Sequence, residues 1–280
     1  MSETDHGMGY GRRATAPEAL LSVLGEYVAP TFGGAWQETL VSAIELFGHS
    51  TAAARQATAR AVRDGALVAH RSGRRSWLQL ADGAAQMLKE AGVMTSGSAM
   101  LSTGLWDVFI LRAAPDAPSS ARTFHPRVQM LLGSLGTLAR DVYIAPSNTG
   151  SAMARQALEE EPGLSVIVLR SEISSPEVSD VVAAAWDLAA ARGAYERLLE
   201  DFGTRTPVTD DECFVAWMEL QRQWRQCMRG DPGLPTDVLP TSWPRTAAEM
   251  LVARRRVDWG GRAAVAFDRL GAGLPARPNL

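Results

Sequence analysis

Residues 51–80 read TAAARQATARAVRDGALVAHRSGRRSWLQL, and the spacing of their apolar side chains changes once, at Gly65. Before this glycine, small apolar residues recur at helical spacing, which predicts a helix over 52–64. Glycine suits the left-handed conformation that commonly ends a helix. After it the side chains alternate as they do in strands, which predicts a hairpin with strands 67–71 and 76–80.

A helical wheel of about 100° per residue separates two faces of this helix. The face that would pack on the preceding helices holds small or apolar residues: Ala54, Ala57, Thr58, Ala61 and Val62. The face that would stand free holds mostly polar residues: Arg55, Gln56, Ala59 and Arg63, with Arg60 at its flank.

Two further helices are predicted upstream, over 17–27 and 36–47, where apolar residues again fall at helical spacing. Three helices followed by a hairpin is the element order of a winged helix-turn-helix, which we expect over 18–98 after a flexible tail, 1–17. The third helix would enter a DNA major groove about 12 Å wide. Because arginine forks fit phosphate oxygens and the paired acceptors of guanine, this helix is predicted to bind DNA.

The predicted hairpin carries three arginines that we assign to DNA binding, Arg71 in its first strand and Arg74 and Arg75 at its tip. The two at the tip would follow the adjacent phosphate backbone or minor groove. Gln56 is either an adenine contact or an ordinary exposed residue. The alternative for the whole face is a solvated helix with incidental arginines. Lys89 is the one lysine among 28 basic residues, so an abundance of arginine is general in this chain and does not by itself indicate a binding face.

Charge is unevenly distributed along the chain, although its formal net charge is only −3. Residues 50–80 contain six arginines and one aspartate, whereas residues 159–201 contain ten acidic residues and three arginines. A basic stretch on an acidic chain favours a dedicated anion-binding face over a general nucleic-acid coat.

The middle of the chain alternates between strand and helix patterns. Strands are predicted over 105–111, 142–146 and 164–169, with helices near 127–135 and over 151–160. Short links between them predict a small ferredoxin-like α/β domain, 99–172.

From Glu177 onward the pattern is helical, and we expect a helical C-terminal domain over 173–280. Its last helix is predicted over 246–257, followed by a loosely held tail from Gly260. The fold class is therefore α+β, with three domains after the N-terminal tail.

Tryptophans in the C-terminal helices offer aromatic surface for a small molecule, and neighbouring arginines would bind its anionic groups. The predicted effector site lies between the α/β domain and these helices and consists of Trp186, Trp217, Arg222, Trp224 and Arg225. The alternative is that these tryptophans are core residues.

The N-terminal third contains the segments LLSVLGEYV (20–28), GGAW (33–36), ARQATARAVR (54–63) and GRRSWLQL (73–80). Together they resemble the PaaX family, bacterial transcription repressors of phenylacetic acid degradation and related aromatic catabolism. The resemblance extends through SLGTLARDVYIAP, where the family usually has glycine in place of Ser134 and Asp141.

The resemblance implies a homodimeric repressor whose effector is an aryl-coenzyme A thioester such as phenylacetyl-coenzyme A. A free aromatic acid, another acyl-coenzyme A or an unrelated signal molecule remain alternatives. A dimer would recognise an inverted repeat in double-stranded DNA, because one helix offers too few base contacts to select a site in a genome.

Enzyme signatures are not found in the sequence. His6, His49, His70 and His125 lack metal-site spacing, and there is no phosphate-binding glycine loop. We therefore expect no catalytic residues, no metal and no cofactor. One alternative is a metal-dependent nuclease of the Cas2 type that uses Asp107, and another is an architectural DNA-binding protein without a ligand.

Two cysteines are too few for a disulfide framework, and no apolar run reaches the roughly 18–20 residues that a membrane span needs. The first residues are polar and glycine-rich, unlike a secretory signal peptide. We expect a cytoplasmic protein that does not contact membranes.

Overall fold

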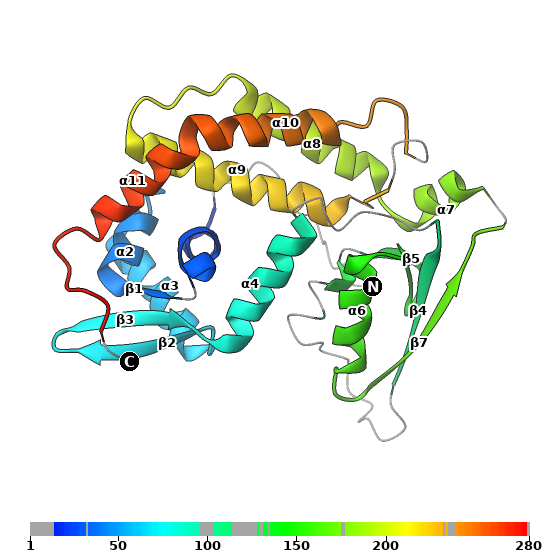
Figure 1. Cartoon of the computed structure of the whole chain (residues 1–280), viewed down its shortest axis with the longest axis horizontal. Helices are drawn as coiled ribbons and strands as arrows, with labels where there is room; N and C mark the ends of the chain where they lie inside the picture. Colours follow the sequence, from blue (N-terminus) through cyan, green and yellow to red (C-terminus); the bar gives the residue numbers. More distant parts are fainter. Residues whose placement is uncertain are drawn as a thin grey trace, which may run out of the picture. The chain divides into compact units, whose positions relative to one another are not determined.

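A computed structural model of the chain describes residues 14–31, 33–95, 104–113, 128, 131–133, 135–174, 177–231, 233–234 and 239–278. The chain divides into two units (Figure 1). The first unit comprises Met1–Glu90, Arg197–Trp224 and Ala247–Leu280, and the second comprises Ala91–Glu196 and Arg225–Thr246. Helix and sheet are mixed, which confirms the α+β class. The predicted helical domain over 173–280 is not a compact unit of its own, because its residues are shared between both units.

The N-terminal part of the first unit contains three helices, a short strand, a hairpin and most of a fourth helix that continues into the second unit. Its elements are α1 (Ala16–Val23), the π-helical turn η1 (Leu24–Val28), the 3-10 turn η2 (Ala29–Thr31), β1 (Gly34–Trp36), α2 (Gln37–Leu46), α3 (Thr51–Arg63), β2 (Leu67–Ser72), β3 (Arg75–Leu80) and α4 (Asp82–Thr95). The strands form an antiparallel sheet in the order β1-β3-β2.

Trp36 differs from the sequence prediction, which placed it in a helix. Its backbone is extended, and it ends β1 opposite Trp77 of β3 before α2 begins at Gln37. The two indole rings meet edge to face with their centroids 5.5 Å apart. Pairing with β3 therefore decides the conformation here, and the helical spacing of Trp36 with later apolar residues does not.

The first unit also contains elements from the other end of the sequence. These include parts of α8 (Leu188–Gly203) and α9 (Asp210–Gly230), together with α10 (Arg245–Arg255), the π-helical turn η3 (Arg256–Gly260) and α11 (Gly261–Leu270). The expectation of a loosely held tail from Gly260 is wrong. Phe267 of α11 stacks on Tyr27 of η1 with ring centroids 4.4 Å apart, so the end of the chain is packed against its beginning.

The second unit is built on a four-stranded antiparallel sheet in the order β5-β6-β4-β7. Its elements are β4 (Trp106–Ala113), β5 (Gly136–Ala139), β6 (Val142–Pro146), α6 (Thr149–Glu159), β7 (Leu164–Ser171) and α7 (Val178–Ala185). The core on the α6 side contains Phe109 and Leu111 of β4 with Ala154 and Leu158 of α6. Four of the nine residues of the helix predicted near 127–135 lie outside the described residues, and four of the others belong to this core: Val128, Leu131, Leu132 and Leu135.

Asp141 stands in the turn between β5 and β6 with φ of 60°. This is the left-handed region that favours glycine, and asparagine or aspartate tolerate it better than most other residues. The turn is therefore formed even though the chain lacks the glycine usual in the family, and Ser134 lies outside the described residues.

Candidate nucleic-acid interface

Helix α3 is fixed in the first unit through its small, buried face. The Ser50 hydroxyl oxygen caps the helix by accepting a hydrogen bond from the Ala53 amide at 3.2 Å. Ala54 and Thr58 are completely buried. The Gln37 side chain of α2 donates to the Thr58 hydroxyl at 3.1 Å, which sets the orientation of α3 relative to α2.

The opposite face of α3 is exposed. It consists of the five residues that the wheel separated from the core: Arg55, Gln56, Ala59, Arg60 and Arg63. Arg60 and Arg63 both lie near Asp64, with nitrogen–oxygen distances of 3.3 and 3.5 Å. These side chains remain more than half exposed, so the pairing is weak and a phosphate can replace it. The Arg55 guanidinium forms no hydrogen bond or ion pair with any residue that the structure describes.

The β2–β3 hairpin carries the second group of cations. Its turn passes through Gly73, whose φ of +62° is a conformation that glycine adopts with little strain. Arg71 and Arg74 are exposed, whereas Arg75 is half buried. Arg75 lies 3.6 Å from Glu38 of α2, so the hairpin is connected to α2 by an ion pair.

The elements enclose a groove of about 340 Å³ between α2, α3 and the hairpin. Arg55, Arg74 and Arg75 line it together with two acidic residues of α2, Glu38 and Glu45. The structure thus brings Arg55 of the helix together with Arg74 and Arg75 of the hairpin at one groove, beside Glu38 and Glu45, whereas Arg60, Arg63 and Arg71 do not line it.

The predicted effector residues fall in different surroundings. Trp217 is 2% exposed, and its indole N–H donates to Glu26 at 2.9 Å, which places this side chain in the core of the first unit. Arg222 and Trp224 follow on α9 in that unit, and Arg225 is the first α9 residue assigned to the second unit.

Trp186 belongs to the second unit. The sequence predicts a helical pattern from Glu177 onward, but the backbone of Trp186 is extended and separates α7 from α8. Its ring covers Gly136 so closely that a Cβ there would lie 2.7 Å away. The indole is 8% exposed, and its N–H has no partner among the described residues.

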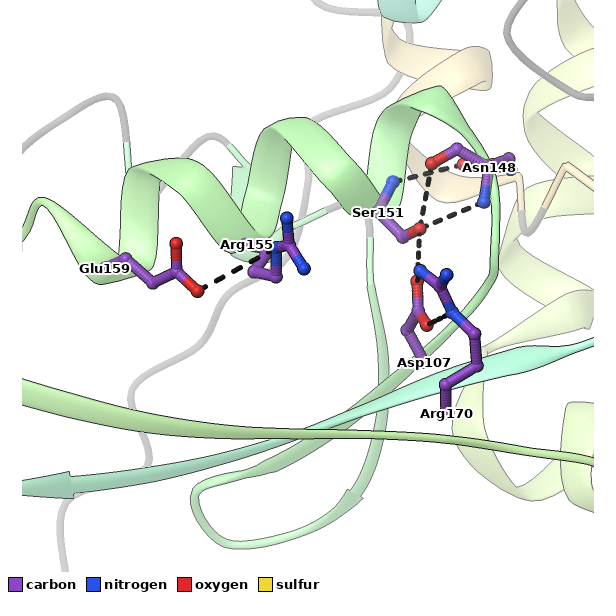
Figure 2. A network of polar contacts seen from close by, with 6 residues as sticks. All are labelled: Asp107, Asn148, Ser151, Arg155, Glu159 and Arg170. Carbon is purple, nitrogen blue, oxygen red and sulfur yellow. Dashed lines mark hydrogen bonds and ion pairs between the residues drawn. The ribbon is translucent and has the colours of Figure 1, made fainter.

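Asp107, the residue of the alternative nuclease hypothesis, lies in a network of polar contacts at β4 (Figure 2). One carboxylate oxygen accepts from the Arg170 Nε at 2.8 Å, and the other accepts from the Ser151 hydroxyl at 2.7 Å. Burial raises the pKa of Asp107, but the hydrogen bonds from Arg170 and Ser151 outweigh burial and hold this pKa below its ordinary value. The carboxylate therefore joins β4, β7 and the first turn of α6, and this is a structural role.

A second buried carboxylate, Asp231, was not identified from the sequence. Its side chain accepts hydrogen bonds from Arg245, from the Tyr195 hydroxyl at 2.8 Å and from the Trp243 indole at 2.9 Å. These contacts hold Asp231, which directly follows α9, against Tyr195 of α8 and Arg245 of α10.

Two absences concern only the part of the chain that the structure describes. No group of three or more His, Cys, Asp or Glu side chains is placed to hold a metal ion. None of the helices there combines the length and apolar character that a bilayer crossing requires.

Helix α3 and the β2–β3 hairpin place this chain in a class of proteins in which a helix and a small sheet form a groove lined with arginines. The family model of PaaX-like proteins matches residues 16–84, and that of the PaaX-like C-terminal domain matches residues 186–267. The chain belongs to the PaaX family, which confirms the resemblance seen in its sequence.

Two individual proteins are similar over most of the chain. The transcriptional repressor PaaX of Escherichia coli (strain K12) is 24% identical over 244 residues, which cover 82% of this chain and 76% of the repressor. The uncharacterized protein Rv0674 from Mycobacterium tuberculosis has a structure with a TM-score of 0.52 and 22% identity, covering 91% of this chain and 99% of that one. This second similarity concerns the fold alone.

Proposed function

We propose that this protein is a transcriptional repressor that binds DNA through α3 and the β2–β3 hairpin, which together act as a winged helix-turn-helix. The observation that carries the proposal is the exposed arginine face of α3, of which Arg55 shares a groove with Arg74 and Arg75 of the hairpin. Membership of the PaaX family and similarity to a transcriptional repressor support it. In this interpretation the side chains that read bases or bind phosphate are Arg55, Gln56, Ala59, Arg60, Arg63, Arg71, Arg74 and Arg75.

The repressor acts as a homodimer on an inverted repeat in the control region of an operon for aromatic catabolism. A dimer doubles the number of base contacts, and its two α3 helices would read half-sites one or two helical turns apart. The strand order β5-β6-β4-β7 fits the ferredoxin-like interpretation of the second unit, which is not needed for base readout.

The effector is an aryl-coenzyme A thioester such as phenylacetyl-coenzyme A, and it releases the repressor from DNA. Release requires that the effector bind the DNA-free conformation more tightly than the DNA-bound one. The five residues proposed for its binding are Trp186, Trp217, Arg222, Trp224 and Arg225, and of these Trp217 already has its indole N–H bonded to Glu26. Trp186 remains a candidate because its indole N–H has no partner among the described residues.

The test uses the full-length protein, because residues from both ends of the chain build the first unit. Selection from random duplexes should yield an inverted repeat, and phenylacetyl-coenzyme A should displace the protein from it, while coenzyme A and phenylacetate alone serve as controls. A protein that binds no duplex would contradict the DNA-binding proposal. Binding that none of the three molecules affects would contradict the effector proposal and favour a ligand-independent DNA-binding protein.

A further inference from the structure

The C-terminal segment, residues 271–278, contacts α2, one of the elements that form the groove, and Trp36, which directly precedes it. It begins directly after α11, whose Phe267 stacks on Tyr27. Gly271 then lies beside the buried Thr39 of α2, where an added Cβ would be in ordinary van der Waals contact with the Thr39 hydroxyl at 3.6 Å. The segment therefore starts in contact with α2.

A hydrogen bond fixes the far part of the segment. The Trp36 indole N–H donates to the Pro275 carbonyl oxygen at 2.8 Å. Trp36 lies directly before Gln37, which lines the groove, and it is paired in register with Trp77 of β3. The end of the described chain is accordingly drawn beside the β2–β3 hairpin (Figure 1).

The segment carries one charge, and it is positive. Its sequence GAGLPARP contains Arg277 and no acidic residue. Arg277 is exposed and forms no ion pair or hydrogen bond with the residues that the structure describes. Two residues span at most about 7 Å, so Arg277 lies close to the point where Pro275 meets Trp36. The two prolines limit the conformations of this short stretch.

We propose that the C-terminal segment is a third DNA-contacting element, in which Arg277 binds a backbone phosphate beside the hairpin. This inference rests on the proposed function, because it requires that α3 and the hairpin face DNA. Arg277 adds affinity and does not read sequence, since phosphate contacts position a protein on the duplex without distinguishing bases. The Trp36–Pro275 hydrogen bond positions this arginine.

The experiment measures binding of the full-length protein to a mixed-sequence duplex of about three helical turns, at about 10 base pairs each, over a range of salt concentrations. Each phosphate contact contributes about 0.9 to the magnitude of the slope of log affinity against log salt. Arg277→Ala should reduce this magnitude by about 0.9, and Arg277→Lys should restore it. The control is Arg269→Ala on α11, whose side chain pairs with Asp211, and this variant should keep the parental slope.

A second variant tests the positioning. Trp36→Phe keeps an aromatic ring but removes the N–H that holds Pro275, so it should lower the slope as Arg277→Ala does, and the two changes together should lower it no further. The inference is overturned if Arg277→Ala has the parental slope, if Arg269→Ala lowers it equally, or if Trp36→Phe leaves it unchanged. A parent protein that binds no duplex would overturn the proposed function, and this inference with it.

Discussion

Trp217 of α9 donates its indole N–H to Glu26 of η1 at 2.9 Å, although 191 positions separate the two residues in the sequence. Gln221, one turn further along α9, donates to the other oxygen of the same carboxylate at 3.3 Å. The ring of Trp217 also lies under the guanidinium of Arg256, 5.5 Å from it. A helix from the C-terminal half thus contributes to the scaffold on which α3 and the hairpin are mounted.

The first prediction is that Trp217→Phe destabilises the protein through this hydrogen bond. A bond to a charged group contributes about 1.5–3 kcal/mol, and phenylalanine leaves the buried side of Glu26 with one donor fewer. Urea unfolding should show a loss of free energy in this range. Gln223→Ala is the control, because Gln223 donates to Asp201 on the exposed side of α9, and we expect a change within about 0.5 kcal/mol. Equal losses in the two variants would contradict the role of the Trp217–Glu26 bond.

The second prediction concerns base readout by α3. Arg55→Ala should leave folding intact, because the side chain is exposed and unpaired among the described residues. If this arginine reads a base, the substitution should cost about 1–3 kcal/mol of operator binding and relax the preference at one position. Arg254→Ala on α10 is the matched control, since its side chain is 74% exposed and remote in sequence from the arginine face. A folded Arg55→Ala protein with parental operator affinity would remove Arg55 from the site.

The two faces of α3 and the β2–β3 hairpin could be predicted, because both depend on residues that are close together in the sequence. In α3, small residues and arginines each recur at helical spacing and so fall on separate faces. In the hairpin, apolar and polar side chains alternate on both sides of Gly73. The sequence predicted a helix at Trp36, but its conformation is set by Trp77, which lies far away in sequence.

Other features depend on partners that no local pattern identifies. Residues Ala263, Ala266 and Phe267 have helical spacing, yet their burial depends on elements near the N-terminus. The same holds for the division into units, since 197–224 and 247–280 belong with the N-terminal elements. Within the candidate interface, the arginines were predicted, whereas the neighbouring carboxylates Glu38 and Asp64 became evident only from the structure.

The third prediction concerns the hairpin. Arg74 and Arg75 are expected to contact phosphates, so the double substitution Arg74→Ala, Arg75→Ala should weaken binding to all duplexes alike. The magnitude of the log-salt slope should fall by about 1.8, about 0.9 for each lost contact. A double variant with the parental slope would show that the tip points away from DNA.

The fourth prediction is that Glu38→Gln strengthens DNA binding. Glu38 pairs with Arg75 at 3.6 Å, and both side chains are about two-fifths exposed, at 44% and 41%. Removing the carboxylate frees Arg75 for phosphate and removes a negative charge from the groove. Because an exposed pair of this kind is worth about 0.2–1 kcal/mol, the gain in affinity should be of that size and should shrink at high salt. Glu249→Gln on α10 controls for the change in net charge, and an equal gain there would attribute the effect to net charge alone.

The last prediction concerns Asp107 and the pH dependence of stability. Its pKa in the folded protein lies below its ordinary value of about 3.9, because hydrogen bonds from Arg170 and Ser151 outweigh burial. A carboxyl group with a lowered pKa stabilises the fold fully above the unfolded pKa, and this contribution is lost as the pH falls through the folded pKa. Asp107→Asn should therefore cost about 1–3 kcal/mol near pH 7, reduced by the partial exposure of Arg170.

The difference between the parent and Asp107→Asn should narrow as the pH falls below about 4, because the carboxylate is protonated in the unfolded chain before it is protonated in the folded protein. Denaturant unfolding across this pH range measures it, and Glu159→Gln is the control because its pair with Arg155 on α6 is exposed and 3.8 Å long (Figure 2). The control should change stability by less than about 0.5 kcal/mol at every pH. Unchanged stability of Asp107→Asn at neutral pH would contradict the structural role of this carboxylate and reopen the nuclease hypothesis, in which its charge is needed for chemistry.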